Sequence, residues 1–162
     1  MLKIIRSMKD LQFGQLMAVY EEGNRLNGEE FWPDLSEGQK ILRAEQDFYQ
    51  YLKECFFPTE GAYYGVWVEG NTYVSALRLE PYRDGLLLEA LETVPTHRQR
   101  GYAKALIQAV LLKEQGRKIY AHIHKGNLPS IRTHESCGFC RISDHAVYID
   151  GSVHPHSYTY CK

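Results

Sequence analysis

A strand, a glycine turn and a helix follow one another between residues 86 and 112, and this order constrains the fold most. Residues 86–94 form an apolar run that predicts a buried strand. Apolar side chains then recur at helical spacing from Ala103 to Leu112. Backbone N–H groups at a helix start lack helical partners and lie at the positive end of the helix dipole. A phosphate-binding site is therefore predicted at the connecting turn, Arg98-Gln99-Arg100-Gly101-Tyr102-Ala103.

Bulk properties favour one soluble domain spanning residues 1–162. A chain of 162 residues with a hydrophobic fraction of 44% can bury a sizeable core and is not globally disordered. The net charge of −1 gives no argument for binding nucleic acid or a membrane. No apolar run approaches the roughly 20 residues of a membrane span, and residues 1–5 are too short for a signal peptide. We expect a cytoplasmic protein.

Cysteine and histidine spacing gives little support for a metal site. Cys137 and Cys140 have the spacing of a redox or metal pair, but no second pair is present. We interpret them as two ordinary thiols beside a turn, and we expect no disulfide in a reducing compartment. His122 and His124 alternate on a predicted strand without a third ligand. The sequence therefore predicts no bound metal.

Charge is distributed unevenly along the chain. Residues 21–47 contain eight acidic and three basic side chains, whereas residues 95–132 contain eight basic side chains and one acidic one, Glu114. A site with an anionic ligand on one side and a cationic ligand on the other would explain this pattern. Two solvated faces of unrelated helices explain it equally well.

Hydrophobic periodicity predicts the element order β-α-α-β-β-β-α-β-α-β-β. Helices are expected from a Ser7–Asp10 capping box to about residue 23, from a Ser36–Gln39 capping box to residue 56, over 103–115 and over 129–137. Residues 23–35 are expected to form a loop. Strands are expected at 2–5, 63–68, 72–79, 86–94, 119–124, 139–149 and 154–161, the last two joined at Asp150-Gly151. The fold class is α/β: a mixed, largely antiparallel sheet of about seven strands with helices on both faces.

Three features together resemble the GNAT superfamily of acetyl-CoA-dependent N-acyltransferases. Arg98-x-x-Gly101-x-Ala103 matches the family signature Gln/Arg-x-x-Gly-x-Gly/Ala, three residues after Pro95. The preceding strand carries an acidic residue and ends in that proline, as in the family. Asn127-x-x-Ser130-Ile131-x-x-His134-x-x-x-Gly138-Phe139 is similar to the family's Asn-x-x-Ala-x-x-x-Tyr-x-x-x-Gly-Phe. The resemblance covers nearly the whole chain, although the first two helices match only in order.

The resemblance implies acetyl-CoA as co-substrate, held between two splayed strands near residues 91–94 and 121–124. The pantetheine arm would be bonded there by backbone groups of Leu91 and Thr93, and a backbone donor would hold the thioester oxygen. Asn127 and Ser130 would lie beside the same arm. The pyrophosphate would contact the turn formed by Arg98, Gln99, Arg100, Gly101, Tyr102 and Ala103.

Two side chains are predicted to be catalytic. By strand alternation Glu89 lies on the cleft face with Leu91 and Thr93, and Glu92 lies on the opposite face. Glu89 is therefore the predicted base, with Glu92 as the second candidate; a structural carboxylate paired with Arg or Lys is the alternative for Glu89. His134 occupies the family's tyrosine position and is the predicted acid for the leaving thiolate. A histidine on the helix surface is the alternative there.

The predicted activity is transfer of an acetyl group from acetyl-CoA to a primary amine of a small molecule or peptide, by direct attack. The acidic region 21–47 favours a cationic acceptor. Two alternatives are a non-catalytic acyl-CoA-binding regulatory module and acyl transfer to a hydroxyl or thiol. The hairpin 147–161 offers a contact for a homodimer.

Overall fold

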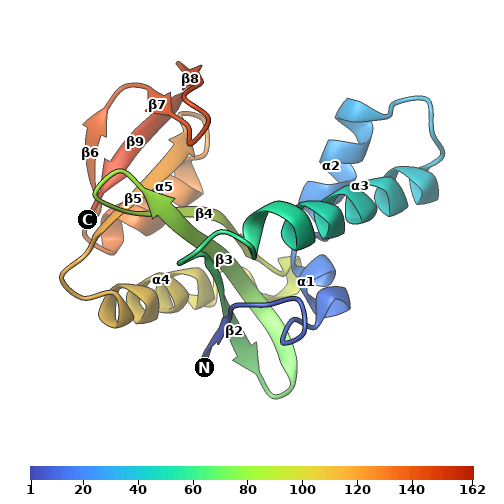
Figure 1. The fold of residues 1–162 in the computed structure, drawn as a ribbon, viewed down its shortest axis with the longest axis horizontal. Coiled ribbons are helices and arrows are strands. Elements are labelled where there is room, and N and C mark those ends of the chain that lie inside the picture. The colour runs from blue at the N-terminus through green and yellow to red at the C-terminus, as the bar shows by residue number, and fades with distance from the viewer.

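The computed structural model describes residues 1–162, which build a central sheet of seven strands in the order β1-β2-β3-β4-β5-β9-β6. Neighbouring strands are antiparallel except for β4 and β5, which are parallel (Figure 1). The predicted mixed, largely antiparallel sheet of about seven strands is confirmed. Its strands are β1 Leu2–Ile5, β2 Tyr63–Glu69, β3 Thr72–Tyr82, β4 Gly85–Thr93, β5 Lys118–His124, β6 Cys140–Ser143 and β9 Ser157–Cys161.

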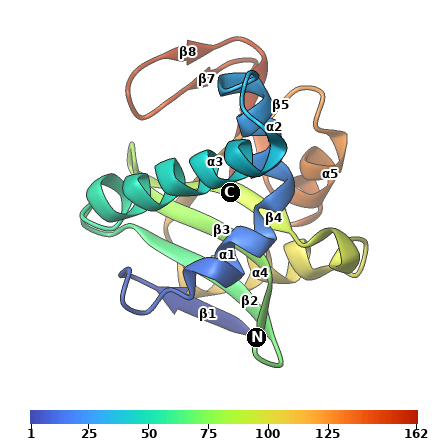
Figure 2. The same cartoon turned by 90° about the vertical axis from the view of Figure 1, so that its right-hand side faces the viewer.

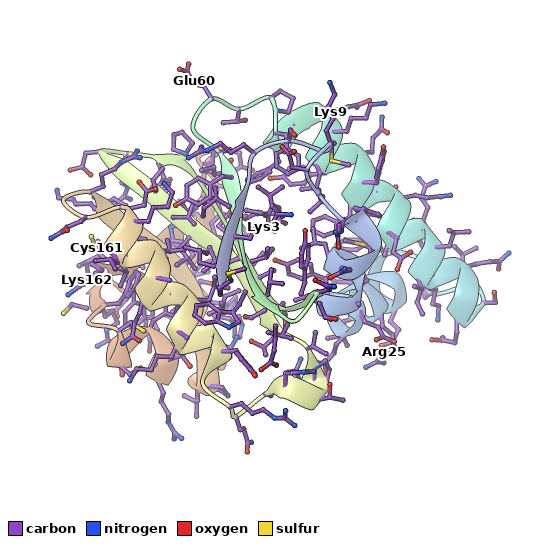
Figure 3. The ribbon with its side chains drawn as sticks, turned by 90° about the horizontal axis from the view of Figure 1, so that it is seen from below. Lys3, Lys9, Arg25, Glu60, Cys161 and Lys162 are labelled. Carbon is purple, nitrogen blue, oxygen red and sulfur yellow. The ribbon has the colours of Figure 1, made fainter.

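Helices cover both faces of this sheet, as predicted. On one face lie α1 (Phe13–Val19), α2 (Glu21–Phe31) and α3 (Glu37–Tyr51), the last continuing into a π-helical turn at Leu52–Phe56 (Figure 2). On the other face lie α4 (Tyr102–Lys113) and α5 (Leu128–Ser136). From below, Figure 3 shows the strand of Lys3 between the two helical layers, with Arg25 outside on the α1–α3 side. None of the helices is long and apolar enough to cross a membrane.

Each face has its own core, because residues along a strand alternate between the two faces. Leu106, Ile107 and Val110 of α4 pack with Leu77, Leu79, Leu86 and Leu88 of the sheet. Leu16 and Met17 of α1 pack with Phe56 and with Tyr64, Val66 and Ala76 of the sheet. Helices thus pack on both faces of the sheet.

The N-terminal third differs from the prediction in two places. Ser7 and Asp10 close a turn rather than a helix: the Ser7 hydroxyl donates to the Asp10 carboxylate, and α1 begins only at Phe13. Most of the predicted loop 23–35 is helical, since α2 extends to Phe31. Gly28 suggested a loop, but a Cβ there would lie 2.8 Å from the Cβ of Lys40. This glycine permits close packing of α2 on α3.

The C-terminal hairpin is also more elaborate than predicted. β6 and β9 pair within the central sheet, while β7 (Ala146–Val147) and β8 (Val153–His154) form a separate two-stranded ladder. The predicted reversal at Asp150-Gly151 lies between β7 and β8 and is confirmed.

A β-bulge in β4 decides which side chains face the helices α1–α3. Glu89 pairs with Arg78 and Glu92 pairs with Ala76, so three steps along β4 oppose two along β3. Ala90, inside the bulge, has a φ of 50°. The additional residue reverses the alternation, and Glu89 and Glu92 therefore share one face. The predicted placement of these two carboxylates on opposite faces is wrong for this reason.

The strands β4 and β5 separate part of the way along their length. Their pairing runs from Gly85 with Lys118 to Leu88 with Ala121 and then stops. Beyond this point β5 continues to pair with β9 on its other side. Residues 89–93 of β4 therefore have no strand neighbour toward β5. The predicted splay is present.

Candidate active site

A cavity of about 630 Å³ lies where the glycine turn meets the splay. Nine of the ten predicted coenzyme contacts line this cavity, and the exception is Arg100. Six lining residues were not predicted as coenzyme contacts: Glu22, His97, Lys104, Pro129, Thr133 and Glu92, the last being the second candidate for the base. The predicted residues that line the cavity are Leu91, Thr93, Arg98, Gln99, Gly101, Tyr102, Ala103, Asn127 and Ser130.

The turn presents free donors to this cavity. The N–H groups of residues 99–104 donate to no backbone carbonyl, whereas the Ala105 N–H donates to the Gly101 carbonyl. Gln99 and Gly101 have φ angles of 61° and 82°, which turn successive N–H groups toward a common point. A Cβ on Gly101 would meet no atom within 4 Å, so the space before the turn is open. Together with Lys104 in the wall, these donors fit a pyrophosphate.

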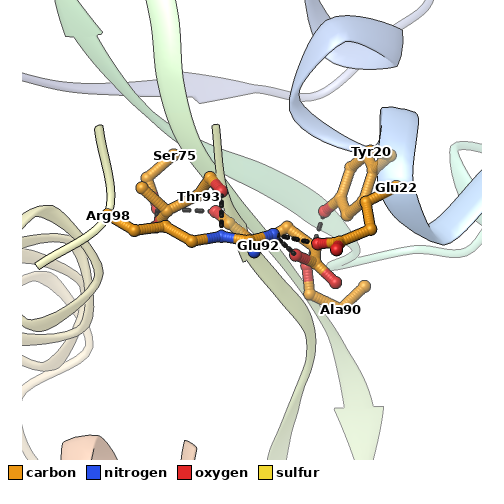
Figure 4. Close-up of polar contacts among 7 residues, drawn as sticks. All are labelled: Tyr20, Glu22, Ser75, Ala90, Glu92, Thr93 and Arg98. Atoms are coloured by element: carbon orange, nitrogen blue, oxygen red, sulfur yellow. Dashed lines mark hydrogen bonds and ion pairs between the residues drawn. The ribbon is translucent and has the colours of Figure 1, made fainter. Parts of the chain in front are cut away.

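The Arg98 side chain extends toward α2 (Figure 4). Its Nε donates to the Thr93 carbonyl at 3.1 Å, and its Nη2 donates to the Glu22 carboxylate. The same Nη2 lies 3.7 Å from Oε2 of Glu92. The hydrogen bond from Arg98 lowers the pKa of Glu22. Arg98 therefore connects the turn to the helices on the other side of β4.

A second cavity, of about 720 Å³, lies between α2, α3 and β4. Much of its lining comes from α2. Because residues 23–35 were expected to form a loop, this cavity was not predicted. The available signal was the combination of aromatic and acidic side chains in residues 21–47. The cavity is lined by Tyr20, Gly23, Asn24, Asn27, Phe31, Trp32, Ala44, Asp47, Phe48, Arg78, Ala90 and Glu92.

Glu92 lines both cavities. Burial raises the pKa of this carboxyl, and the nearby Arg98 guanidinium opposes the rise. The backbone on both sides is held in place: the Ser75 hydroxyl donates to the Glu92 carbonyl, and the Tyr20 hydroxyl donates to the Ala90 carbonyl at 2.6 Å (Figure 4). Glu92 is thus a fixed, partly desolvated carboxylate where the two cavities meet.

Glu89, the predicted base, lines neither cavity. Its Oε2 accepts a hydrogen bond from Nε of Arg78 at 3.1 Å, and the Arg78 guanidinium lies over the Tyr51 ring. Burial, together with the Glu89 carboxylate, raises the pKa of Glu80 to about 7. Glu89 is therefore the centre of a charged cluster on the sheet, as in the structural alternative, and the geometry favours Glu92 as the base.

His134 is buried, at 2% exposure, so the surface alternative is wrong. Its Nδ1 lies 2.8 Å from the Ser130 carbonyl, which assigns the ring proton to Nδ1, and its Nε2 is buried without a partner. Burial lowers the pKa of His134 and favours the neutral ring. Such a ring carries no proton on Nε2, so this geometry does not support the predicted role as an acid.

Asn127 and His122, two further polar residues considered in the sequence, have structural surroundings of different kinds. The Asn127 Oδ1 accepts the Ser130 N–H at 3.2 Å and so caps α5. His122 lies between the rings of Tyr82 and Tyr148. Nowhere do three His, Cys, Asp or Glu side chains lie together in a way that could hold a metal ion.

The site thus combines a parallel strand pair that splays beside a glycine turn with a second cavity across the strand. The chain belongs to the acetyltransferase (GNAT) family, whose model matches residues 27–139. A search of curated proteins finds no match.

Solved structures show the same fold over almost the whole chain. A putative GNAT acetyltransferase from Desulfovibrio desulfuricans is 14% identical, with 100% of this chain and 98% of that one covered and a TM-score of 0.62. A mutant spermidine N-acetyltransferase from Vibrio cholerae is 18% identical, with 99% and 93% covered and a TM-score of 0.63. The ribosomal-protein-S18-alanine N-acetyltransferase from Escherichia coli is 16% identical, with 99% and 92% covered and a TM-score of 0.59. At these identities the likeness shows the fold alone.

Proposed function

We propose that this protein transfers an acetyl group from acetyl-CoA to a primary amine. The observation that carries the proposal is the position of Glu92, which lines both the cavity at the glycine turn and the cavity across β4. A coenzyme in the first cavity and an amine in the second would meet at this carboxylate. Two of the solved structures with this fold are named as N-acetyltransferases, which supports an amine as the acceptor.

The coenzyme cavity fits acetyl-CoA through its backbone donors. The N–H groups of residues 99–104 would hold the pyrophosphate, and the unpaired stretch 89–93 of β4 would lie along the pantetheine arm. The Thr93 carbonyl already accepts Nε of Arg98, so we assign the arm's backbone contacts to Leu91 first. When bound, acetyl-CoA supplies a thioester carbonyl carbon as the electrophile.

In this reaction Glu92 and the backbone of β4 have separate roles. Glu92 accepts a proton from the amine, because only the neutral amine has a lone pair with which to attack. An N–H of the unpaired β4 stretch donates to the thioester oxygen, where negative charge develops. A thiol with a pKa near 8.5 leaves without full protonation, so the reaction does not require a proton from His134.

Release of free thiol from acetyl-CoA tests this proposal, measured without acceptor and with a panel of amines, alcohols and thiols. We expect release that depends on an amine, with an N-acetylated product found by mass spectrometry. Tight binding of acetyl-CoA with no release would favour the regulatory module. Release that depends on an alcohol or a thiol would favour the other acyl transfers.

A further inference from the structure

We infer that the acceptor is an aromatic primary monoamine, bound between α2 and α3 with its amino group at Glu92. The inference rests on the proposed function and narrows its acceptor. It is drawn from the lining of the 720 Å³ cavity, whose volume is within the usual range for small-molecule sites.

The cavity offers an aromatic wall. Tyr20, Phe31, Trp32 and Phe48 all line it. Phe48 packs edge-on against Tyr20, with ring centroids 5.4 Å apart, so the inner part of the wall is preformed. Phe31 lies at the rim, 62% exposed, with its ring 6.0 Å from that of Trp32. An aromatic ring between these side chains would bury apolar surface and stack at the distances that aromatic pairs prefer.

The charges of the cavity accommodate one ammonium group. Two carboxylates line it, but Asp47 already pairs with Arg43, at 3.3 Å. The Arg43 guanidinium also lies 5.6 Å from the centroid of the Trp32 ring. Arg78 lines the same cavity, and its charge is paired with Glu89. A second cation on the ligand would find no unpaired carboxylate in the lining, so a monoamine fits better than a polyamine.

Glu92 is therefore the carboxylate left for the amino group. Its closest cation is Arg98, at 3.7 Å, and the shorter contact of Arg98 is with Glu22. An ammonium ion at Glu92 would complete the charge balance of the cavity. It would also lie at the boundary with the coenzyme cavity, which Glu92 lines too.

An amine panel tests the inference. At saturating acetyl-CoA we expect kcat/KM for phenethylamine and tryptamine to exceed that for putrescine and spermidine at least tenfold. Phe31→Ala should raise KM for phenethylamine about fivefold, as the loss of one aromatic contact implies, without changing KM for acetyl-CoA. Leu26→Ala is the matched control, because Leu26 is an exposed apolar residue of α2, 51% exposed, that does not line the cavity. It should leave both KM values unchanged.

A binding measurement separates this inference from the proposed function. The chain has two tryptophans, of which only Trp32 lines the cavity, while Trp67 lies on β2. Bound phenethylamine should therefore shift the NMR resonance of the Trp32 indole N–H and leave that of Trp67 in place. A shift without acetylation of any amine would support the ligand class and overturn the proposed function. Preference for spermidine, with Phe31→Ala unaffected, would overturn the inference and leave amine acetylation standing. No shift and no acetylation would overturn both.

Discussion

The Arg98 guanidinium donates to the Glu22 carboxylate, and this contact joins the glycine turn to the first residues of α2. Both side chains are more than 40% exposed, at 41% and 45%, so solvent screens the pair and its direct contribution to stability is small. The contact matters because it holds the Arg98 guanidinium beside Glu92, whose carboxylate lies 3.7 Å away.

Arg98→Gln should move the pH dependence of the reaction. Burial raises the pKa of Glu92 and Arg98 lowers it, so loss of the guanidinium raises that pKa further. A base must be deprotonated to act, and the acidic limb of kcat/KM should therefore shift to higher pH. The lost activity should return as the pH is raised. Arg25→Gln, which removes an arginine of α2 paired with Glu29, should leave the profile unchanged.

Glu92→Gln should reduce kcat/KM roughly 10²-fold, because the amide keeps the shape of the side chain but accepts no proton. The measurement is steady-state kinetics with the best amine of the panel. Full activity in this variant would remove Glu92 from the mechanism.

Glu89→Gln should instead affect stability. Arg78 would keep a neutral partner in place of a charged one, which should cost about 1–2 kcal/mol in the free energy of unfolding. Denaturant unfolding measures this loss, and the acidic limb of kcat/KM should stay where it is. A displaced limb would return the base role to Glu89.

Gly101→Ala should weaken acetyl-CoA binding at least tenfold, about 1.4 kcal/mol, because the new methyl group enters open space before the donors of the turn. The residue has a φ of 82°, so strain of about 1–2 kcal/mol is expected as well. Gly116→Ala is a matched control near the other end of α4, with a φ of 87° and nothing within 4 Å of its added Cβ. It should show the strain in thermal unfolding and no change in the dissociation constant from calorimetric titration.

His134→Phe should make the protein less sensitive to acid. Burial lowers the pKa of His134 in the folded state, so below about pH 6.5 the unfolded chain binds a proton that the folded chain does not. The free energy of unfolding therefore falls as the pH is lowered, and the variant should lose part of that slope. Unfolding in urea at pH 7.5, 6.5 and 5.5 measures it. His145→Phe, at an exposed position, should keep the wild-type slope.

The turn and α4 could be predicted because their signals are local. The contiguous turn 98–103 supplies five of the 15 residues that line the cavity beside it, and the strand and the helix that flank the turn follow their periodicities. The bulge at Ala90 carries no such signal: no glycine marks it, and its carbonyl is bonded by Tyr20, 70 positions away. The cavity between α2, α3 and β4 was missed for a related reason, since Gly28 permits a contact with Lys40 that only the packed helices reveal.

The bulge also sets which way every later residue of β4 faces. If all residues of β4 paired with β3 in unbroken alternation, Glu92 would turn toward α4, into the core that contains Leu86 and Leu88. An ionised carboxylate there would be buried without a partner, at a cost of several kcal/mol. Deletion of residue 90 would instead leave two steps along β4 opposite two along β3, and Glu92 would keep its present face. The strand thus carries one residue more than its pairing with β3 uses.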